Sequence, residues 1–261
     1  MKIETPYYNI YVLDGSEEQV GEGETGTYYV VASNGTFMCK NNGFMSTVVP
    51  VRGIGTLSEF HFEEGISYNF GKIAANLTYQ IKQFFAKVVD IHQAESCVIL
   101  YYNKLTGQYA FSIPEQCVSH GSVRYRIEGQ VAEEGMSNYV PIGTIHSHCD
   151  FQAFHSGVDD RDEEFWDGLH ITFGHNDKEE FSISASVVAN GNRGAINPEQ
   201  VLEGIELVQG DIYRLVEQPE EVVQGVETAM PEWLEQILSY EEYEDKYGER
   251  RVESDQVNEE N

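Results

Sequence analysis

One long amphipathic stretch lies between two regions of β-type sequence, and this order limits the fold more than any other feature. Between Ile73 and Val88, apolar residues recur at spacings of three and four, as on the buried face of a helix. Short runs rich in β-branched and aromatic residues lie on both sides, bounded by Gly, Asn or Asp. Strands interleaved with helices predict an α+β chain, with a mixed β-sheet flanked by helices.

Patterning and charge divide the 261 residues into three regions. Residues 1–68 predict a small β-rich N-terminal domain, with hairpin turns such as Asn41-Asn42-Gly43. Residues 69–216 carry the amphipathic stretch and most of the remaining strands. Residues 217–261 hold fifteen acidic and three basic side chains, which predicts an acidic tail with one amphipathic helix after Pro231 and a disordered end. This tail is either a solvated, solubilising segment or a helix that docks a partner.

Individual elements follow from the same patterns. Strands are predicted at residues 7–13, 28–32, 36–39, 47–51, 97–102, 108–112, 122–127, 140–148, 169–174 and 181–189. A short helix is predicted from Ser156 to Trp166, a turn over residues 190–194, and a further helix from Asn197-Pro198 through Leu207.

The charge excludes several classes of partner. A net charge of −28 argues against nucleic-acid binding, since that affinity depends on Lys and Arg replacing phosphate counterions, and it disfavours anionic membranes.

No run approaches the roughly 18 apolar residues of a membrane-spanning helix, and residues 1–20 lack a secretory signal. Four scattered cysteines without a Cys-x-x-Cys pair indicate reduced thiols. We expect a cytoplasmic protein with a basic or neutral protein partner.

Two histidines give the clearest chemical signal. His146 and His148 are two apart on an extended segment, so both side chains point to the same side and both imidazoles can reach one metal ion. Asp159 begins the predicted helix and can supply a carboxylate as third ligand. Two His and one carboxylate leave the fourth tetrahedral position of zinc open for water, as in a catalytic site.

Each of these residues also has a simpler explanation. Ser156 and Asp159 have the spacing of a helix capping box, in which the serine caps the helix and the acid reaches back. A His-x-His pair on a strand is only weakly specific for a metal. The two explanations are compatible, however, because the helix start that holds Asp159 would also aim it at the metal. The combination of spaced residues therefore favours a metal site.

His146, His148, Ser156 and Asp159, together with Glu95 just before the strand 97–102, resemble the zinc motif of the JAMM metalloproteases, also called the JAB/MPN family. The resemblance covers roughly residues 70–200. It implies a JAB/MPN fold, similar to that of cytidine deaminases, and one catalytic Zn²⁺. Members often have Pro after the second histidine, where this chain has Cys149, so the resemblance leaves the conformation of that loop open.

The resemblance also implies roles for these side chains. His146, His148 and Asp159 would hold zinc, and Glu95 would move a proton from water to the leaving nitrogen. Ser156 would donate a hydrogen bond to the oxyanion. His155, which is next to Ser156, would line the cleft or lie at its rim. Cys149 either fills space as a small buried residue, or binds the metal or becomes oxidised.

Family members cleave peptide or isopeptide bonds after ubiquitin or ubiquitin-like modifiers. The sequence around His146 resembles that of a group of bacterial proteins encoded in PRTRC-type or antiphage gene clusters. These clusters also encode activating-enzyme-like and conjugating-enzyme-like proteins. The leading hypothesis is thus a zinc isopeptidase or peptidase for a ubiquitin-like protein. One alternative is a zinc-binding interaction module of such a system. Another is a processing peptidase for an unrelated phage or cell-wall protein.

Overall fold

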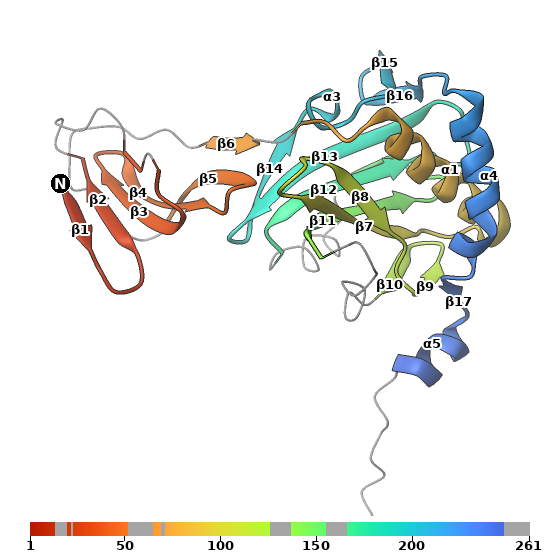
Figure 1. Cartoon of the computed structure of the whole chain (residues 1–261), viewed down its shortest axis with the longest axis horizontal. Helices are drawn as coiled ribbons and strands as arrows, with labels where there is room; N and C mark the ends of the chain where they lie inside the picture. Colours follow the sequence, from red (N-terminus) through yellow and green to blue (C-terminus); the bar gives the residue numbers. More distant parts are fainter. Residues whose placement is uncertain are drawn as a thin grey trace, which may run out of the picture.

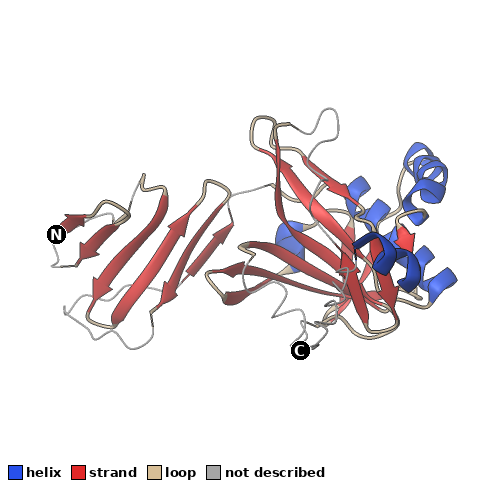
Figure 2. Ribbon diagram, turned by 90° about the horizontal axis from the view of Figure 1, so that it is seen from below, coloured by secondary structure: helices blue, strands red, loops and turns tan. Residues whose placement is uncertain are grey.

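The computed structural model describes residues 1–13, 20–21, 23–51, 65–68, 71–125, 137–154 and 166–247. These residues form an α+β fold in which strands predominate, arranged in a six-stranded sheet, an eight-stranded sheet and a three-stranded sheet. Figures 1 and 2 show the six-stranded sheet at one end of the molecule and most of the helices toward the other. No helix within the described ranges is both long enough and apolar enough to cross a membrane.

The N-terminal sheet consists of consecutive strands, and only β2 and β3 pair in parallel. Its strands are β1 (Lys2–Glu4), β2 (Asn9–Val12), β3 (Gly26–Ala32), β4 (Gly35–Asn41), β5 (Met45–Pro50) and β6 (Gly65–Tyr68). Its own buried cluster is small and comprises Leu13, Val30, Ala32, Phe37 and Cys39.

The eight-stranded sheet is mixed, because β11 and β12 are parallel while their outer neighbours are antiparallel. Along the sheet the order is β15-β16-β13-β12-β11-β7-β8, and β14 pairs with β13. The bounds are β7 (Cys97–Asn103), β8 (Tyr109–Ser112), β11 (Tyr139–His148), β12 (Gly168–Gly174), β13 (Phe181–Ala189), β14 (Asn192–Ile196), β15 (Ile205–Gln209) and β16 (Ile212–Leu215).

Helix α1 (Ala75–His92) covers one face of this sheet with the apolar stripe that its sequence predicts. Its side chains Ile81, Phe84, Phe85 and Val88 are fully buried in the main core. Phe85 packs edge-on against Phe173 of β12, with ring centroids 5.8 Å apart. The helix ends at Gln93, whose left-handed backbone (φ 51°) turns the chain back toward β7. This turn places Glu95 immediately before the sheet.

The central strands present two different faces, because side chains alternate along a strand. Ile145, Ile171, Phe173, Ile183 and Ala185 belong to the core under α1. The residues between them are polar but also buried: Thr144, His146, His148, His170, Thr172, Ser182 and Ser186. We refer to these two sides as the apolar face and the polar face.

The third sheet joins the middle of the chain to its C-terminal region. It has the order β10-β9-β17, and β9 and β17 are parallel. The elements are β9 (Gln116–Ser119), β10 (Ser122–Tyr125), α4 (Glu220–Leu234), β17 (Ile237–Leu238) and α5 (Tyr240–Tyr247). Helix α4 packs beside α1, with Trp233 edge-on to Phe84 at a centroid separation of 6.4 Å.

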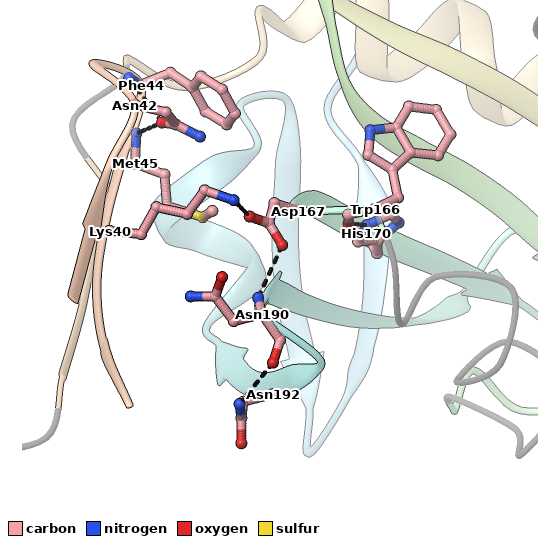
Figure 3. Close-up of polar contacts among 9 residues, drawn as sticks. All are labelled: Lys40, Asn42, Phe44, Met45, Trp166, Asp167, His170, Asn190 and Asn192. Carbon is pink, nitrogen blue, oxygen red and sulfur yellow. Dashed lines mark hydrogen bonds and ion pairs between the residues drawn. The ribbon is translucent and has the colours of Figure 1, made fainter. Parts of the chain in front are cut away.

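Figure 3 shows the contact between the N-terminal sheet and the main sheet. Lys40 of β4 forms an ion pair with Asp167, whose other carboxylate oxygen accepts a hydrogen bond from the Asn190 backbone at 2.8 Å. Met45 of β5 is 2% exposed and belongs to the main core, and Phe44 packs against that core. The N-terminal sheet is therefore attached through both an ion pair and an apolar contact.

Two expectations for the region after β13 are wrong. The turn predicted over residues 190–194 is shorter, because β14 begins at Asn192 and pairs along β13. The helix predicted from Asn197-Pro198 through Leu207 ends as α3 (Pro198–Val201), and Ile205 and Leu207 lie in β15. Asn197 does cap α3, accepting a hydrogen bond from the Glu199 backbone. Gly204, with φ +75°, then turns the chain into a hairpin.

The prediction of one helix after Pro231 is also wrong. Pro231 lies inside α4, which begins eleven residues earlier at Glu220. The apolar residues that follow are divided between the end of α4 and the strand β17, and α5 begins at Tyr240. A proline lacks the N–H that an interior helix position needs, which favours a break, but packing on α1 outweighs this near the helix end. The end predicted to be disordered lies outside the described residues from 248 onward.

Candidate functional site

His146 and His148 lie side by side at the end of β11, on the polar face. Their Nε2 atoms are 3.3 Å apart and their ring centroids 5.1 Å apart, and each residue is only 5% exposed. On the neighbouring strand, His146 pairs with Thr172, whose hydroxyl lies 3.4 Å from His146 Nε2. The structure thus brings both imidazoles to one buried point, as the alternation of the strand predicts.

The separation of these two nitrogens fits a shared zinc ion. Zinc–nitrogen bonds of about 2.0–2.1 Å at a tetrahedral angle place two ligand nitrogens about 3.3–3.4 Å apart, the distance found here. His148 Nδ1 lies 3.4 Å from the Gln152 carbonyl. When the hydrogen of the His148 ring is on Nδ1, Nε2 carries the lone pair and faces His146. The pair therefore has the donor atoms and the spacing for one metal ion.

Glu95 reaches the same region from the segment before β7. Its residue is 9% exposed. In the β7–β11 pairing His146 lies opposite Cys97, and the Ser147 backbone N–H donates to the Ser96 carbonyl at 2.8 Å. Extending this register by one residue places Glu95 opposite His148, on the same face of the sheet. The glutamate that sequence reasoning selected is therefore adjacent to the histidine pair.

Strand β9 holds the backbone of Glu95 in place. The Glu95 N–H donates to the Ser119 carbonyl at 2.9 Å. The buried Gln116 side chain accepts from the Cys97 N–H at 2.8 Å and donates to the Cys97 carbonyl at 2.9 Å, in the manner of a neighbouring strand. Gln116 is fully buried. Strand β9 therefore holds the segment that carries Glu95 at two points, Glu95 itself and Cys97.

Three predicted site residues, His155, Ser156 and Asp159, lie outside the described residues, as does the predicted helix apart from Trp166. The chain is described again from Trp166, where contacts with His170 hold it in place. The Trp166 carbonyl lies 3.0 Å from His170 Nε2, and Thr144 Oγ1 lies 2.8 Å from His170 Nδ1. Both ring nitrogens of His170 thus have partners.

The turn after His148 is tied to the β12–β13 connection by backbone hydrogen bonds. The Asn176 N–H donates to the Cys149 carbonyl at 2.7 Å, and the His175 N–H donates to the Phe151 carbonyl at 2.6 Å. A Cβ atom on Gly174 would lie 2.2 Å from the Ala153 nitrogen, so only glycine allows this close approach. The turn is therefore held firmly where the histidine strand ends.

Cys149 belongs to a second group of ligand-type side chains. Atoms of His120, Cys149 and Asp150 that could bind a metal ion all lie within 4.8 Å of one another. Cys149 is buried, whereas the other two residues are exposed. Burial raises the pKa of the Cys149 thiol above its ordinary value, and the charges of Asp150 and Glu95 add to this effect.

A second glutamate, in the segment just before β9, has a structural role elsewhere. Glu115 binds the Lys246 ammonium and the Tyr247 hydroxyl of α5, and these contacts hold the pKa of its carboxyl below the ordinary value. It therefore attaches α5 to the start of β9.

Sequence reasoning missed several residues that support the site. Thr172 and His170 could have been found as polar positions that alternate with apolar ones in the strand 169–174. Gln116 and His120 carry no such local signal, because long-range pairing of β9 brings them to the site. Asp150 was visible only as one of several acids near the histidines.

No protein-family model matches this chain, and no curated protein matches it either. Among solved structures, the solution structure of protein DSY2949 from Desulfitobacterium hafniense is similar to part of it. The two chains share 13% identity and a TM-score of 0.36, over 45% of this chain and 86% of that one. Because a similarity this weak carries no argument, the geometry of the site alone supports a function.

Proposed function

We propose that this chain is a zinc-dependent isopeptidase or peptidase of the JAMM type, which removes or processes a ubiquitin-like modifier in the cytoplasm. The observation that carries the proposal is the 3.3 Å separation of His146 Nε2 and His148 Nε2 at the end of a buried strand. Glu95 on the adjacent segment, 9% exposed, adds a carboxylate to the same face. Two imidazoles and a nearby carboxylate form the core of a hydrolytic zinc site.

The architecture supports a JAB/MPN fold as part of the proposal. A long helix, α1, precedes the strand next to the histidine strand and packs under the mixed sheet. The histidine strand β11 lies between antiparallel β7 and parallel β12. This arrangement places Glu95 and the histidine pair at neighbouring ends of β7 and β11, as the proposed chemistry requires.

His146, His148 and Asp159 are the residues that would hold zinc in this site. When bound, zinc would polarise the scissile carbonyl and lower the pKa of a water molecule. Glu95 would accept the proton of the attacking water and deliver it to the leaving nitrogen. The Ser156 hydroxyl would donate a hydrogen bond to the oxyanion. Burial of His146 and His148 excludes bulk water and strengthens these interactions.

The proposed substrates and partners are proteins. We propose a ubiquitin-like protein or its conjugates as substrate, with activating- and conjugating-enzyme-like proteins as further partners. The net charge of −28 supports encounter with a basic protein surface. The N-terminal sheet and the acidic C-terminal region are the proposed regions for selecting the substrate.

The proposal is tested by cleavage of a panel of modifier fusions with the purified full chain and Glu95→Gln. We expect the wild-type chain to cleave one class of fusion, and Glu95→Gln to lose cleavage while zinc content stays unchanged. Glu206→Gln is a matched control, because Glu206 of β15 is exposed and forms an ion pair with Arg214 of β16. A wild-type chain that binds zinc but cleaves no fusion would support the interaction module instead.

The ligand assignment has its own test in metal content. We expect His146→Ala and Asp159→Ala to lose the zinc ion of this site together with activity. Ser156→Ala should keep zinc and lower turnover on the order of 10²-fold, as for loss of one oxyanion donor. Full zinc content in His146→Ala would contradict this ligand assignment.

A further inference from the structure

The three residues of the second group come from two segments far apart in the sequence. His120 occupies the turn between β9 and β10, and Cys149 and Asp150 follow the end of β11. Their potential ligand atoms lie within 4.8 Å of one another, whereas ligands of a tetrahedral zinc with bonds of about 2.0–2.3 Å are about 3.3–3.6 Å apart. Because Asp150 is exposed, rotation of its side chain can bring the carboxylate closer to the other two ligand atoms.

The His120 ring is oriented as in a metal ligand. Its Nδ1 lies 3.1 Å from the Gln93 carbonyl, which accepts a hydrogen bond from the ring N–H. The lone pair of Nε2 is then directed toward Asp150 Oδ1, 3.6 Å away. Metal-binding histidines almost always donate their second ring N–H to such a partner, which fixes the tautomer. Edge-on packing of Phe151, with a centroid separation of 5.1 Å, further limits ring rotation.

The Cys149 thiol is fixed in position by its backbone. Cys149 adopts a left-handed conformation (φ 34°), unusual for a residue other than glycine. Its carbonyl accepts from the Asn176 N–H at 2.7 Å, and the preceding His148 carbonyl accepts from the Phe151 N–H at 2.8 Å. Because the Cys149 backbone and the His120 ring are already held in place, ion binding has to order mainly the exposed Asp150 carboxylate, which lowers its entropic cost.

We propose that His120, Cys149 and Asp150 form a second metal site, for a zinc-like divalent ion, separate from the site of His146 and His148. A thiolate and an imidazole favour zinc or cobalt, whereas magnesium and calcium prefer oxygen ligands. Three protein ligands leave one position open to solvent. This site contains sulfur and the histidine site does not, so the two can be told apart by spectroscopy.

The experiment loads the full chain with Co²⁺ in place of zinc and records bound cobalt and the near-ultraviolet sulfur-to-cobalt charge-transfer absorption. We expect the wild-type chain to show this absorption. Cys149→Ser should remove it together with one equivalent of cobalt. His120→Ala and Asp150→Asn alter exposed residues, so we expect both variants to stay folded. Loss of an outer partner of a metal-bound histidine costs about 10–100-fold in affinity, so each variant should weaken cobalt binding at least about tenfold.

Matched variants separate this site from its neighbour and from other thiols. His146→Ala should retain the charge-transfer absorption, whatever the outcome for cleavage of modifier fusions. Cys117→Ser alters the partly exposed cysteine of β9 and should also retain it. Absence of the absorption from the wild-type chain at saturating cobalt would overturn the proposal. Its loss in Cys117→Ser, or its persistence in Cys149→Ser, would do the same.

Discussion

The two faces of the eight-stranded sheet are built from alternate residues of the same strands, yet they differ in almost every other respect. The apolar face packs under α1, and residues such as Phe173 and Ile183 join one continuous core. On the polar face, His146, His170 and Ser186 are equally buried, but each needs a hydrogen-bond partner or a ligand.

This difference separates apolar packing from the ligand-type side chains, which lie on opposite sides of the same strands. The apolar face stabilises the fold through burial, which depends on volume and tolerates conservative exchange. The polar face depends on the identity and position of each group. Changes to the two faces should therefore separate loss of folding from loss of the site.

The largest expected effect on stability is at the apolar face. Phe85→Ala removes a fully buried ring that packs on Phe173, and loss of such a ring costs about 3–5 kcal/mol. Urea unfolding measures this, and metal content per folded chain should stay unchanged. Ile91→Ala, at a half-exposed position on α1, is the control, with a change of at most about 0.5 kcal/mol. A loss of metal at full folding would contradict the separation of the faces.

Lys82 is a charged exception on α1, 4% exposed and donating to the Asn176 and Lys178 carbonyls. Burial lowers the pKa of Lys82 to about 8, an effect opposed by Asp177. An unfolded lysine titrates near 10.4. Between about pH 8 and 10.4 the unfolded chain therefore binds more protons than the folded one, so the Lys82 contribution makes stability rise with pH.

The shift corresponds to roughly 3 kcal/mol across that window. Urea unfolding of the wild-type chain and Lys82→Met at pH 7 and pH 10 tests it. The wild-type chain should gain stability relative to the variant at the higher pH, while Lys87→Met, an exposed change on the same helix, should not alter the pH dependence. A wild-type-to-variant difference that does not change with pH would argue against a depressed pKa.

A smaller effect is expected where β9 supports the polar face. Gln116→Ala leaves the buried backbone N–H and carbonyl of Cys97 without their partner, which costs about 1–3 kcal/mol. Because Glu95 lies two residues before Cys97, cleavage should fall through kcat while zinc content is kept. Gln108→Ala, at an exposed turn, is the comparison. Unchanged kcat with reduced stability would limit Gln116 to a structural role.

The smallest effect is expected at the junction of the two large sheets. Lys40→Ala removes the partner of Asp167, a partly exposed ion pair of the kind that contributes about 0.2–1 kcal/mol. Hydrogen exchange of β4 and β5 should increase, while β11 and β12 stay unchanged. Lys104→Ala, in the exposed turn after β7, should change neither. Faster exchange in β12 as well would show that the junction also supports the site.

Runs of β-branched and aromatic residues predicted five strands of the main sheet, β7, β8, β11, β12 and β13. Alternation of side chains along a strand predicted that His146 and His148 lie on one face. The helix 75–92 was predicted from apolar residues with a period near 3.6. The hairpin of β15 and β16 was missed because Leu202, Ile205 and Leu207 are spaced closely enough to suggest a helix.

The partners that hold the site in place were not predictable. Gln116 acts through a side chain that replaces a strand, and His120 reaches Asp150 only because β9 folds beside the start of β7. Such contacts depend on residues 19 or more positions apart, so no local pattern records them. The histidine pair, in contrast, is a local feature of one strand.

The position of β17 in the sequence determines when β9 gains its second neighbouring strand during synthesis. Gln116 donates its backbone N–H to the Gln236 carbonyl at 2.9 Å, and β17 continues this pairing. During synthesis, the histidine strand emerges from the ribosome well before residues 236–238. A growing chain therefore carries His146 and His148 while β9, which hydrogen-bonds the Glu95 backbone, still lacks one of its two neighbouring strands.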